Sequence, residues 1–215
     1  MNTSEKFVIT ISREIGSGGH TVGRILSEKL GVRYSDKDLI RGLEKEFNLT
    51  RSGIEKLKGE KKNWLSDFLT HYAPVPNAKE LLGADSKYTV EFRPDITTAD
   101  VYEAECEILK GIADEGSCVI AGRSGFFVLK DHPNKFDVFI HASRANRIAR
   151  IMKRQKLSEK EAIEIIEYVD KARENYVRKY ADTSRYDLRN YDLVLNMDYL
   201  TEDEAVECIL KAISK

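Results

Sequence analysis

Residues 7–35, FVITISREIGSGGHTVGRILSEKLGVRYS, carry the strongest fold signal in the chain. Residues 7–11 are mostly apolar and β-branched, which is typical of a strand buried on both faces of a sheet. Glycines follow at positions 16, 18 and 19, and apolar residues then recur with helical spacing as far as Gly31. Residues 32–35 fit a second, shorter strand. The segment therefore predicts a strand, a glycine loop, a helix and a strand, which together form a βαβ unit.

The rest of the chain alternates between apolar runs and helical repeats. Three further strands are predicted over residues 118–121, 137–141 and 191–195. Helices are predicted within 38–72 and from Ser143, with a loop over 73–95. Three capping-box patterns, Thr97 to Asp100, Ser158 to Glu161 and Thr201 to Glu204, predict the starts of helices over 97–115, over 158–180 and from Thr201. This alternation predicts an α/β fold in three layers, with a five-stranded, mostly parallel sheet covered by helices on both faces.

Composition and charge exclude several classes of protein. With 215 residues, of which 41% are hydrophobic and 33% charged, the chain can bury one sizeable core. A net charge of −1 argues against a nucleic-acid partner. No stretch approaches the roughly 20 apolar residues of a membrane span, so we expect a cytoplasmic protein without a membrane partner. Neither the three cysteines nor the four histidines have metal-ligand spacing, so no metal site is expected.

The glycine loop lies where a phosphate can bind. Free N–H groups at a helix N-terminus converge on one point, the helix dipole favours negative charge there, and glycines let an anion approach the backbone. Glycines between an apolar strand and an amphipathic helix therefore predict a phosphate-binding loop. Its candidate residues are Gly16, Ser17, Gly18, Gly19, His20 and Thr21.

Five stretches together resemble the cytidylate-kinase-like family, a branch of the nucleoside monophosphate kinases. They are ITISREIGSGGHTVGRILSEKLGVRYSDKDLI from Ile9, CVIAGR from Cys118, FIHASRANRIAR from Phe139, VDKARENYVRKY from Val169 and NYDLVLN from Asn190. They occur in the family's order and span nearly the whole chain. The resemblance implies a P-loop kinase-like fold in a single domain. Its expected parts are a core of residues 6–40, 97–143 and 188–215, a helical acceptor-side insertion of 41–96 and a helical lid of 144–187.

The loop departs from the P-loop pattern GxxxxGK(S/T) of the wider family. Alignment on the first strand and Gly31 places Gly19 at the lysine, His20 at the Mg²⁺-binding Ser or Thr, and Arg13 at the first glycine. The resembled branch has a basic residue after GSGG, and His20 takes that place. Because the P-loop lysine bridges the β- and γ-phosphates, Arg13 is our candidate substitute cation. The alternative is a structural arginine where the chain leaves the sheet.

Three residues of the expected lid are further candidates. Arg147 lies on a helix rich in arginine, and the resemblance implies that it contacts the donor nucleotide. Asp170 and Arg173 reproduce the DxxR pair of the lid in the resembled kinases. Their spacing alone fits an ordinary i,i+3 ion pair equally well, so both interpretations stay open.

Candidates for the acceptor side come from the ends of two predicted strands. Arg123 directly follows the strand of residues 118–121, at the sheet edge where open α/β folds bind ligands. The resemblance implies that this arginine contacts the acceptor nucleotide. Asp36 and Arg41 follow the short strand of residues 32–35 and are expected on the same side.

The resemblance implies phosphoryl transfer from ATP, with Mg²⁺ carried on the nucleotide, to a nucleoside monophosphate. CMP or dCMP is the expected acceptor. The expected catalytic residues are Arg13, His20, Arg147, Asp170 and Arg173. Two alternatives stay open: a nucleotide- or phosphate-binding module without transferase activity, and a kinase for another small acceptor. The second arises because residues 45–96 resemble the standard acceptor domain least. The sequence leaves the oligomeric state open.

Overall fold

The computed structural model describes residues 1–35, 98–122 and 124–214, apart from the side chains of residues 98–101. Three sequence-predicted site residues, Asp36, Arg41 and Arg123, lie outside the described residues. So do the helices predicted within 38–72, the loop of 73–95 and the acceptor-side insertion of 41–96.

The described elements alternate along the chain as the apolar pattern predicts. The strands are β1 (Val8–Arg13), β2 (Arg33–Ser35), β3 (Cys118–Ala121), β4 (Lys135–His141) and β5 (Leu193–Asn196). The helices are α1 (Gly19–Leu30), α6 (Thr98–Glu115), α7 (Gly125–Val128), α8 (Arg144–Gln155), α9 (Glu159–Ala181), the 3₁₀ helix η2 (Leu188–Asn190) and α10 (Glu202–Ile213). The sequence did not predict the two short helices, α7 and η2.

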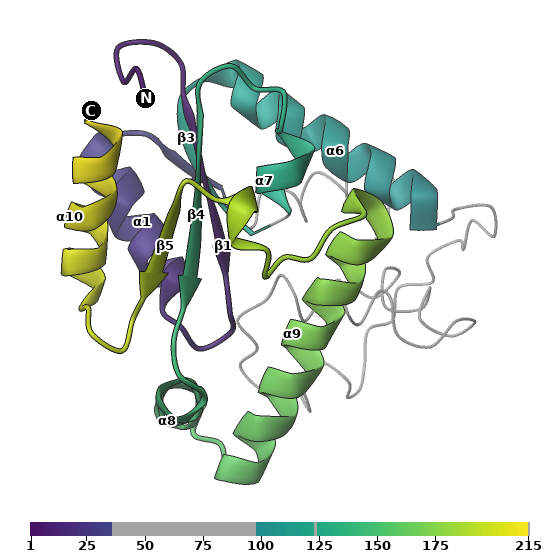
Figure 1. Cartoon of the computed structure of the whole chain (residues 1–215), viewed down its shortest axis with the longest axis vertical. Coiled ribbons are helices and arrows are strands. Elements are labelled where there is room, and N and C mark those ends of the chain that lie inside the picture. Colours follow the sequence, from purple (N-terminus) through teal and green to yellow (C-terminus); the bar gives the residue numbers. More distant parts are fainter. Residues whose placement is uncertain (36–97, 123, 215) are drawn as a thin grey trace, which may run out of the picture.

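The described strands form one five-stranded sheet in the order β2-β3-β1-β4-β5, and every pair in it is parallel (Figure 1). β1 is central, and β3 and β4, which follow each other in the chain, lie on opposite sides of it. The loop after β1 therefore leaves the middle of the sheet at its carboxyl edge, where open α/β sheets bind ligands. The predicted α/β fold is confirmed, and its mostly parallel sheet is parallel throughout the described strands.

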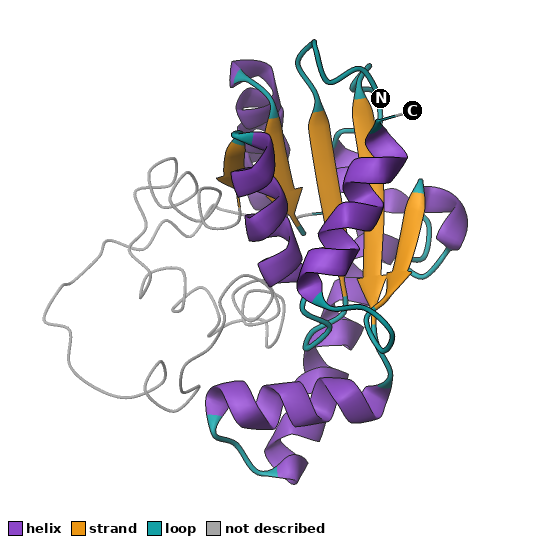
Figure 2. Cartoon of the chain, turned by 90° about the vertical axis from the view of Figure 1, so that its left-hand side faces the viewer, coloured by secondary structure: helices purple, strands orange, loops and turns teal. Residues whose placement is uncertain are grey.

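The alternation of side chains along β1 assigns helices to the two faces of the sheet. Ile9 and Ile11 are fully buried in a cluster with Val22 of α1 and Ile209 of α10. Thr10 points to the opposite face, where its methyl group approaches the start of α7. Helices cover both faces of the sheet (Figure 2), so the predicted three-layer arrangement is confirmed.

Helix α8 and the N-terminal part of α9 lie beyond the carboxyl ends of the strands, and the rest of α9 runs back to the level of the sheet (Figure 1). They pack on each other through a small apolar cluster, and partly buried Ile15 of the glycine loop joins it. The predicted capping box at Ser158 is present, with Glu161 as its partner, and so is the one at Thr201. The segment expected to form a helical lid is therefore helical, and it contacts the loop directly.

Among the described residues, no helix combines the length and apolar character needed to cross a bilayer. The same residues contain no group of three or more His, Cys, Asp or Glu placed to hold a metal ion.

Candidate functional site

The glycine loop connects β1 to α1 by a turn that requires glycine at two positions. Gly16 and Gly18 have φ angles of +80° and +92°, a region that L side chains rarely adopt. The turn is closed by Ser17, whose N–H and Oγ both donate to the carbonyl oxygen of Glu14, at 3.3 and 2.8 Å. The N–H groups of Gly18 and Gly19 make no hydrogen bond with the described residues, as expected for a helix N-terminus. The loop therefore presents donors for an anion.

Arg13 crosses the carboxyl edge of the sheet towards β3. A Cβ atom built on Gly122, directly after β3, would lie only 1.8 Å from Nη1 of Arg13. The guanidinium group therefore fills the space that the glycine leaves. A Cβ atom built on Gly19 would lie 2.7 Å from the Cβ atom of Arg13. Arg13 thus lies at the mouth of the loop, between the first turn of α1 and the end of β3.

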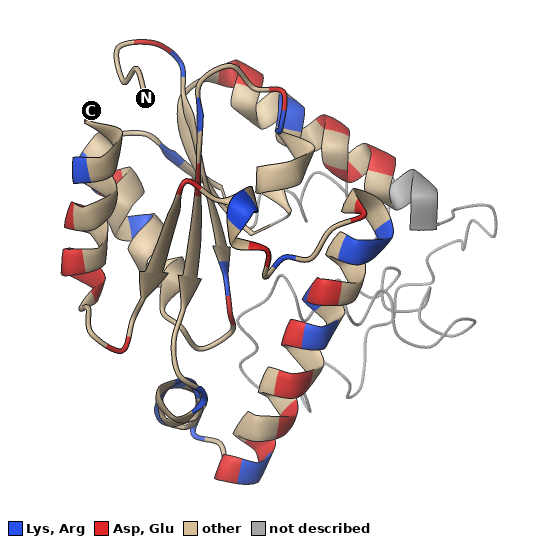
Figure 3. Ribbon diagram, viewed as in Figure 1, with Lys and Arg blue, Asp and Glu red and all other residues tan. Residues whose placement is uncertain are grey.

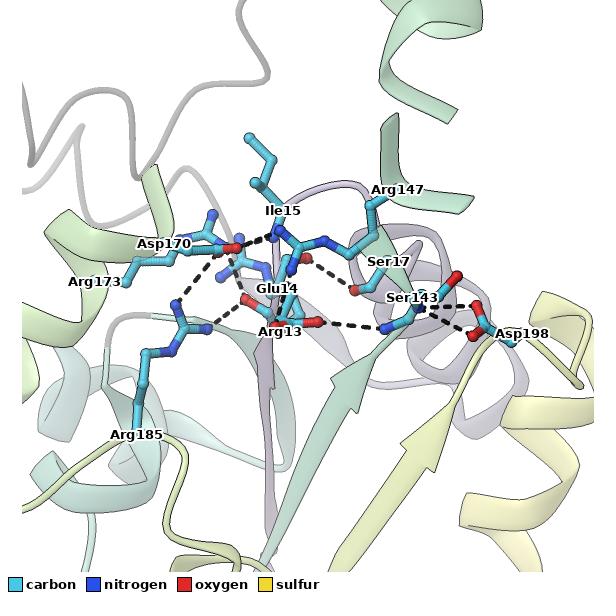
Figure 4. A network of polar contacts seen from close by, with 11 residues as sticks. Arg13, Glu14, Ile15, Ser17, Ser143, Arg147, Asp170, Arg173, Arg185 and Asp198 are labelled. Atoms are coloured by element: carbon cyan, nitrogen blue, oxygen red, sulfur yellow. Dashed lines mark hydrogen bonds and ion pairs between the residues drawn. The ribbon is translucent and has the colours of Figure 1, made fainter. Parts of the chain in front are cut away.

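Arg147 and Asp170 connect α8 and α9 to the loop (Figure 4). Arg147 is 5% exposed and Asp170 is 8% exposed, and Nη2 of Arg147 pairs with Oδ2 of Asp170. Nη1 of Arg147 lies 2.9 Å from a carboxylate oxygen of Glu14. The N–H of Ile15 donates to Oδ1 of Asp170 at 3.2 Å. One carboxylate on α9 therefore holds both the loop backbone and the arginine from α8.

Two further arginines converge on the carbonyl oxygen of Arg13, the last residue of β1. Nη1 of Arg173 donates to it at 2.7 Å, and Nη2 of Arg185 donates to it at 2.5 Å. Arg173 also lies 3.9 Å from Oδ1 of Asp170, so the i,i+3 ion pair exists but is long. The closer partner of Asp170 is Arg147. The DxxR pair is thus part of a larger network around the loop.

The network contains more positive than negative charge. Within the described residues, three guanidinium groups, those of Arg147, Arg173 and Arg185, share the carboxylates of Glu14 and Asp170. Three of their buried nitrogens make no hydrogen bond with described residues: Nε of Arg147, Nε of Arg173 and Nη1 of Arg185. Unpaired donors in a buried site are costly, so this geometry favours a bound anion.

The pKa of Arg173 is shifted first by its burial and then by the neighbouring arginines. Its burial, followed by the guanidinium groups of Arg13 and Arg185, lowers the pKa of Arg173, and Asp170 opposes the shift in part. An arginine starts so high that it still remains charged at neutral pH. A small recess of about 20 Å³, partly open to solvent, lies beside it. The recess is lined by Ser12, Arg13, Gly122, Ser124, Phe126, Arg173, Val177 and Arg185.

His20 and Thr21 lie in the first turn of α1, next to the loop glycines. Nδ1 of His20 is 3.0 Å from the hydroxyl oxygen of Tyr34 in β2, and the two rings meet edge to face. The same hydroxyl donates to the carbonyl oxygen of His20 at 3.2 Å. The N–H of Thr21 donates to the carbonyl oxygen of Gly18 at 2.9 Å. His20 therefore contacts β2, whereas the arginines gather around the end of β1.

The structure brings together most of the sequence-predicted site residues that it describes. Arg13, Arg147, Asp170, Arg173 and the loop of residues 16–19 form one cluster, and His20 contacts Tyr34 of β2. Sequence reasoning missed Glu14 and Arg185. Glu14 lies in the segment between β1 and the loop glycines. Its carboxylate could have been proposed from the sequence as a counter-charge for the arginine-rich helix that begins after Ser143. No local pattern marks Arg185.

Charge on the outer elements is distributed in the usual way for a helical surface. Figure 3 shows the basic residues that gather on α8, and the acidic and basic residues that alternate along α9. Arg144 of α8 pairs with Glu167 of α9, and both side chains are more than half exposed. Arg147 differs from these basic neighbours because it is buried.

The fold and the site define a P-loop kinase-like α/β protein, with its loop and arginines at the carboxyl edge of a parallel sheet. Comparison with known families is more specific: the chain belongs to the cytidylate kinase-like family, whose model matches residues 8–199. The family expected from the sequence motifs, a family of nucleoside monophosphate kinases, is therefore confirmed.

Distant relatives match over nearly the whole chain. A cytidylate kinase of Sulfolobus acidocaldarius is 27% identical over 209 residues, which cover 96% of this chain and 94% of the relative. A cytidylate kinase of Sulfurisphaera tokodaii is 29% identical over 204 residues, with coverage of 94% and 92%.

Solved structures show the shared fold. An uncharacterized protein from Eubacterium ventriosum has a TM-score of 0.68 at 24% identity, and the match covers 98% of this chain and 99% of that one. Shikimate kinase from Bacteroides thetaiotaomicron has a TM-score of 0.53 at 16% identity, with coverage of 97% and 99%.

Proposed function

We propose that this protein transfers a phosphoryl group from ATP to a nucleoside monophosphate, with CMP or dCMP as the acceptor and Mg²⁺ carried on the nucleotide. The observation that carries the proposal is the buried arginine cluster beside the glycine loop. Its positive charge exceeds its negative charge, and three of its donors lack hydrogen-bond partners among the described residues. The relatives named cytidylate kinase support the choice of acceptor.

Phosphoryl transfer requires mainly positioning and charge neutralisation from a protein. In our proposal the N–H groups of Gly18 and Gly19 hold the phosphates of the donor. Arg13 and Arg173 neutralise charge where the phosphoryl group passes between donor and acceptor, because both lie between the loop and the end of β3. Arg147, on α8, also contacts the donor nucleotide in this proposal. Asp170 orients these groups through its contacts with Arg147 and the Ile15 N–H.

The proposal keeps the division of the chain into a core, an acceptor-side insertion of residues 41–96 and a lid of residues 144–187. The contacts of Ile15 and Asp170 join the glycine loop to α8 and α9. Closure of a lid over bound substrates would exclude water and limit hydrolysis of the donor. Asp36, Arg41 and Arg123 remain the proposed acceptor-binding residues.

The test is a direct assay of product formation with ATP and Mg²⁺ against CMP, dCMP, UMP, AMP and GMP. Shikimate and gluconate serve as acceptors outside the nucleotide class. We expect turnover with CMP or dCMP above all others. Turnover only with a non-nucleotide acceptor would replace the proposal with another small-molecule kinase. Binding of ATP without transfer to any acceptor would leave a nucleotide-binding module.

A further inference from the structure

The backbone at Gly19 leaves no room for the lysine that P-loop kinases place at this position. A Cβ atom there would lie 2.7 Å from the Cβ atom of Arg13 and 3.5 Å from that of Ile140. The first of these distances is shorter than real Cβ contacts, and the clashing atom belongs to the rigid base of the Arg13 side chain. Positive charge for the transferred phosphoryl group must therefore come from other elements of the fold.

Arg185 brings a guanidinium group to this place from the turn after α9. The residue is 4% exposed, and its Nη2 donates to the Arg13 carbonyl at 2.5 Å. Its Nη1 makes no hydrogen bond with the described residues, and the nearest contact given for it is Oδ1 of Asp170, at 3.7 Å. Figure 4 shows the side chain pointing at Arg13 and Asp170. Arg185 also lines the recess together with Arg13 and Arg173.

The surroundings of Arg185 hold it in this orientation. The backbone N–H of Arg185 donates to a carboxylate oxygen of Glu174 at 3.1 Å, and its backbone carbonyl oxygen accepts from the Tyr191 hydroxyl at 2.8 Å. Its guanidinium group lies over the rings of Phe139 and Tyr186, at 5.8 and 5.4 Å from their centroids. A side chain fixed in this way loses little further freedom when it binds a ligand.

We propose that Arg185 binds substrate phosphate in the recess and, with Arg173, supplies the positive charge that a P-loop lysine supplies elsewhere. The inference rests on the proposed function for its catalytic part. One nitrogen of the guanidinium group anchors to the end of β1, and the other is left for a phosphate oxygen, which suits the forked geometry of arginine.

The experiment compares Arg185→Gln with the parent and with Arg189→Gln as the matched control. Glutamine is polar but carries no charge, and because its side chain is two bonds shorter it also gives up the hydrogen bond to the Arg13 carbonyl. Arg189 lies in η2, close to Arg185 in sequence, and its exposed side chain pairs with Asp187. Two quantities are measured: the affinity for inorganic tripolyphosphate by calorimetry, and kcat with ATP and CMP. Thermal unfolding shows that each variant is folded at the assay temperature.

We expect Arg185→Gln to lower tripolyphosphate affinity by about ten- to a hundredfold, the range for losing one hydrogen bond to a charged group. Its kcat should fall by about a hundredfold, as when one contact to developing charge is removed. Arg189→Gln should match the parent in both assays. A folded Arg185→Gln with parental affinity and parental kcat overturns the inference and leaves the proposed function standing.

Two further outcomes are also decisive. If the parent transfers phosphate to no acceptor, the proposed function fails, and tripolyphosphate affinity alone decides whether Arg185 binds phosphate. If Arg185→Gln does not fold, the guanidinium NMR signal of Arg185 in the parent decides, assigned by its absence from the spectrum of Arg185→Lys. A shift of that signal at saturating tripolyphosphate supports the inference, and an unchanged signal overturns it.

Discussion

Replacing Asp170 by asparagine tests whether the arginine cluster is held together by this one carboxylate. Asp170 pairs with Arg147 and accepts the Ile15 N–H at 3.2 Å, and its Oδ1 lies 3.7 Å from Arg185. Asparagine keeps an oxygen for the Ile15 N–H but removes the charge. Breaking a buried ion pair on one side costs about 3–5 kcal/mol, because it leaves an uncompensated buried charge. The retained hydrogen bond places our expectation near the lower limit, at about 3 kcal/mol.

For a chain of this size, that loss corresponds to a fall in Tm of about 6–12 °C, since 1 kcal/mol shifts Tm by about 2–4 °C. The measurement is thermal and urea unfolding, each with and without tripolyphosphate. Because the variant has one fewer negative charge among its arginines, a bound anion should recover part of the lost stability. The recovery should exceed the stabilisation of the parent by the same anion, since anions stabilise the state that binds them.

Glu167→Gln is the matched control, because Glu167 also lies on α9 and pairs with an arginine of α8. Its pair with Arg144 is solvent-exposed, and exposed ion pairs contribute little to stability. An Asp170→Asn variant as stable as this control would refute the argument that the cluster depends on Asp170. A loss of stability that tripolyphosphate does not reduce would refute the claim that the cluster attracts anions.

Gly16→Ala should abolish the rise in Tm on adding ATP and lower the free energy of unfolding by about 1 kcal/mol or more. The reason is that φ of Gly16 is +80° and that the alanine Cβ would lie 2.9 Å from a backbone oxygen. Gly31→Ala, where φ is +64° but nothing lies within 4 Å, should keep the ATP response. In the transfer assay, Arg13→Gln should cut kcat by about a hundredfold, whereas His20→Gln should change it little; the opposite ranking would assign the charge to His20. Hydrogen bonds from the Ser143 N–H and the Asn146 side chain lower the pKa of Asp198. The ionised Asp198 therefore contributes to stability at pH values above its ordinary pKa of 3.8, and this contribution is lost as the pH falls through the folded-state pKa. Asp198→Asn should therefore lower Tm at neutral pH, and the difference from the parent should disappear in acid; a difference independent of pH would contradict this linkage.

The order and type of the described elements follow from local patterns in the chain. The apolar run before Gly16 predicts β1 because a strand buried on both faces needs such residues. The capping boxes at Ser158 and Thr201 place the starts of α9 and α10 correctly, since each satisfies helix N–H groups with neighbouring side chains. The positive φ angles of Gly16 and Gly18 are likewise local requirements, which glycine meets at little cost.

The composition of the site depends on contacts between distant segments. Arg147 belongs to a basic run that could have been wholly solvated, and it is buried because Glu14 and Asp170 approach it from two other elements. No pattern in the sequence around Arg185 indicates a functional role. Its side chain reaches Arg13 only after α9 has packed across the end of β1. Torsional preference and apolar periodicity act over a few residues and so appear in the sequence. The convergence of charged side chains requires the sheet order β2-β3-β1-β4-β5, which exists only once the chain has folded.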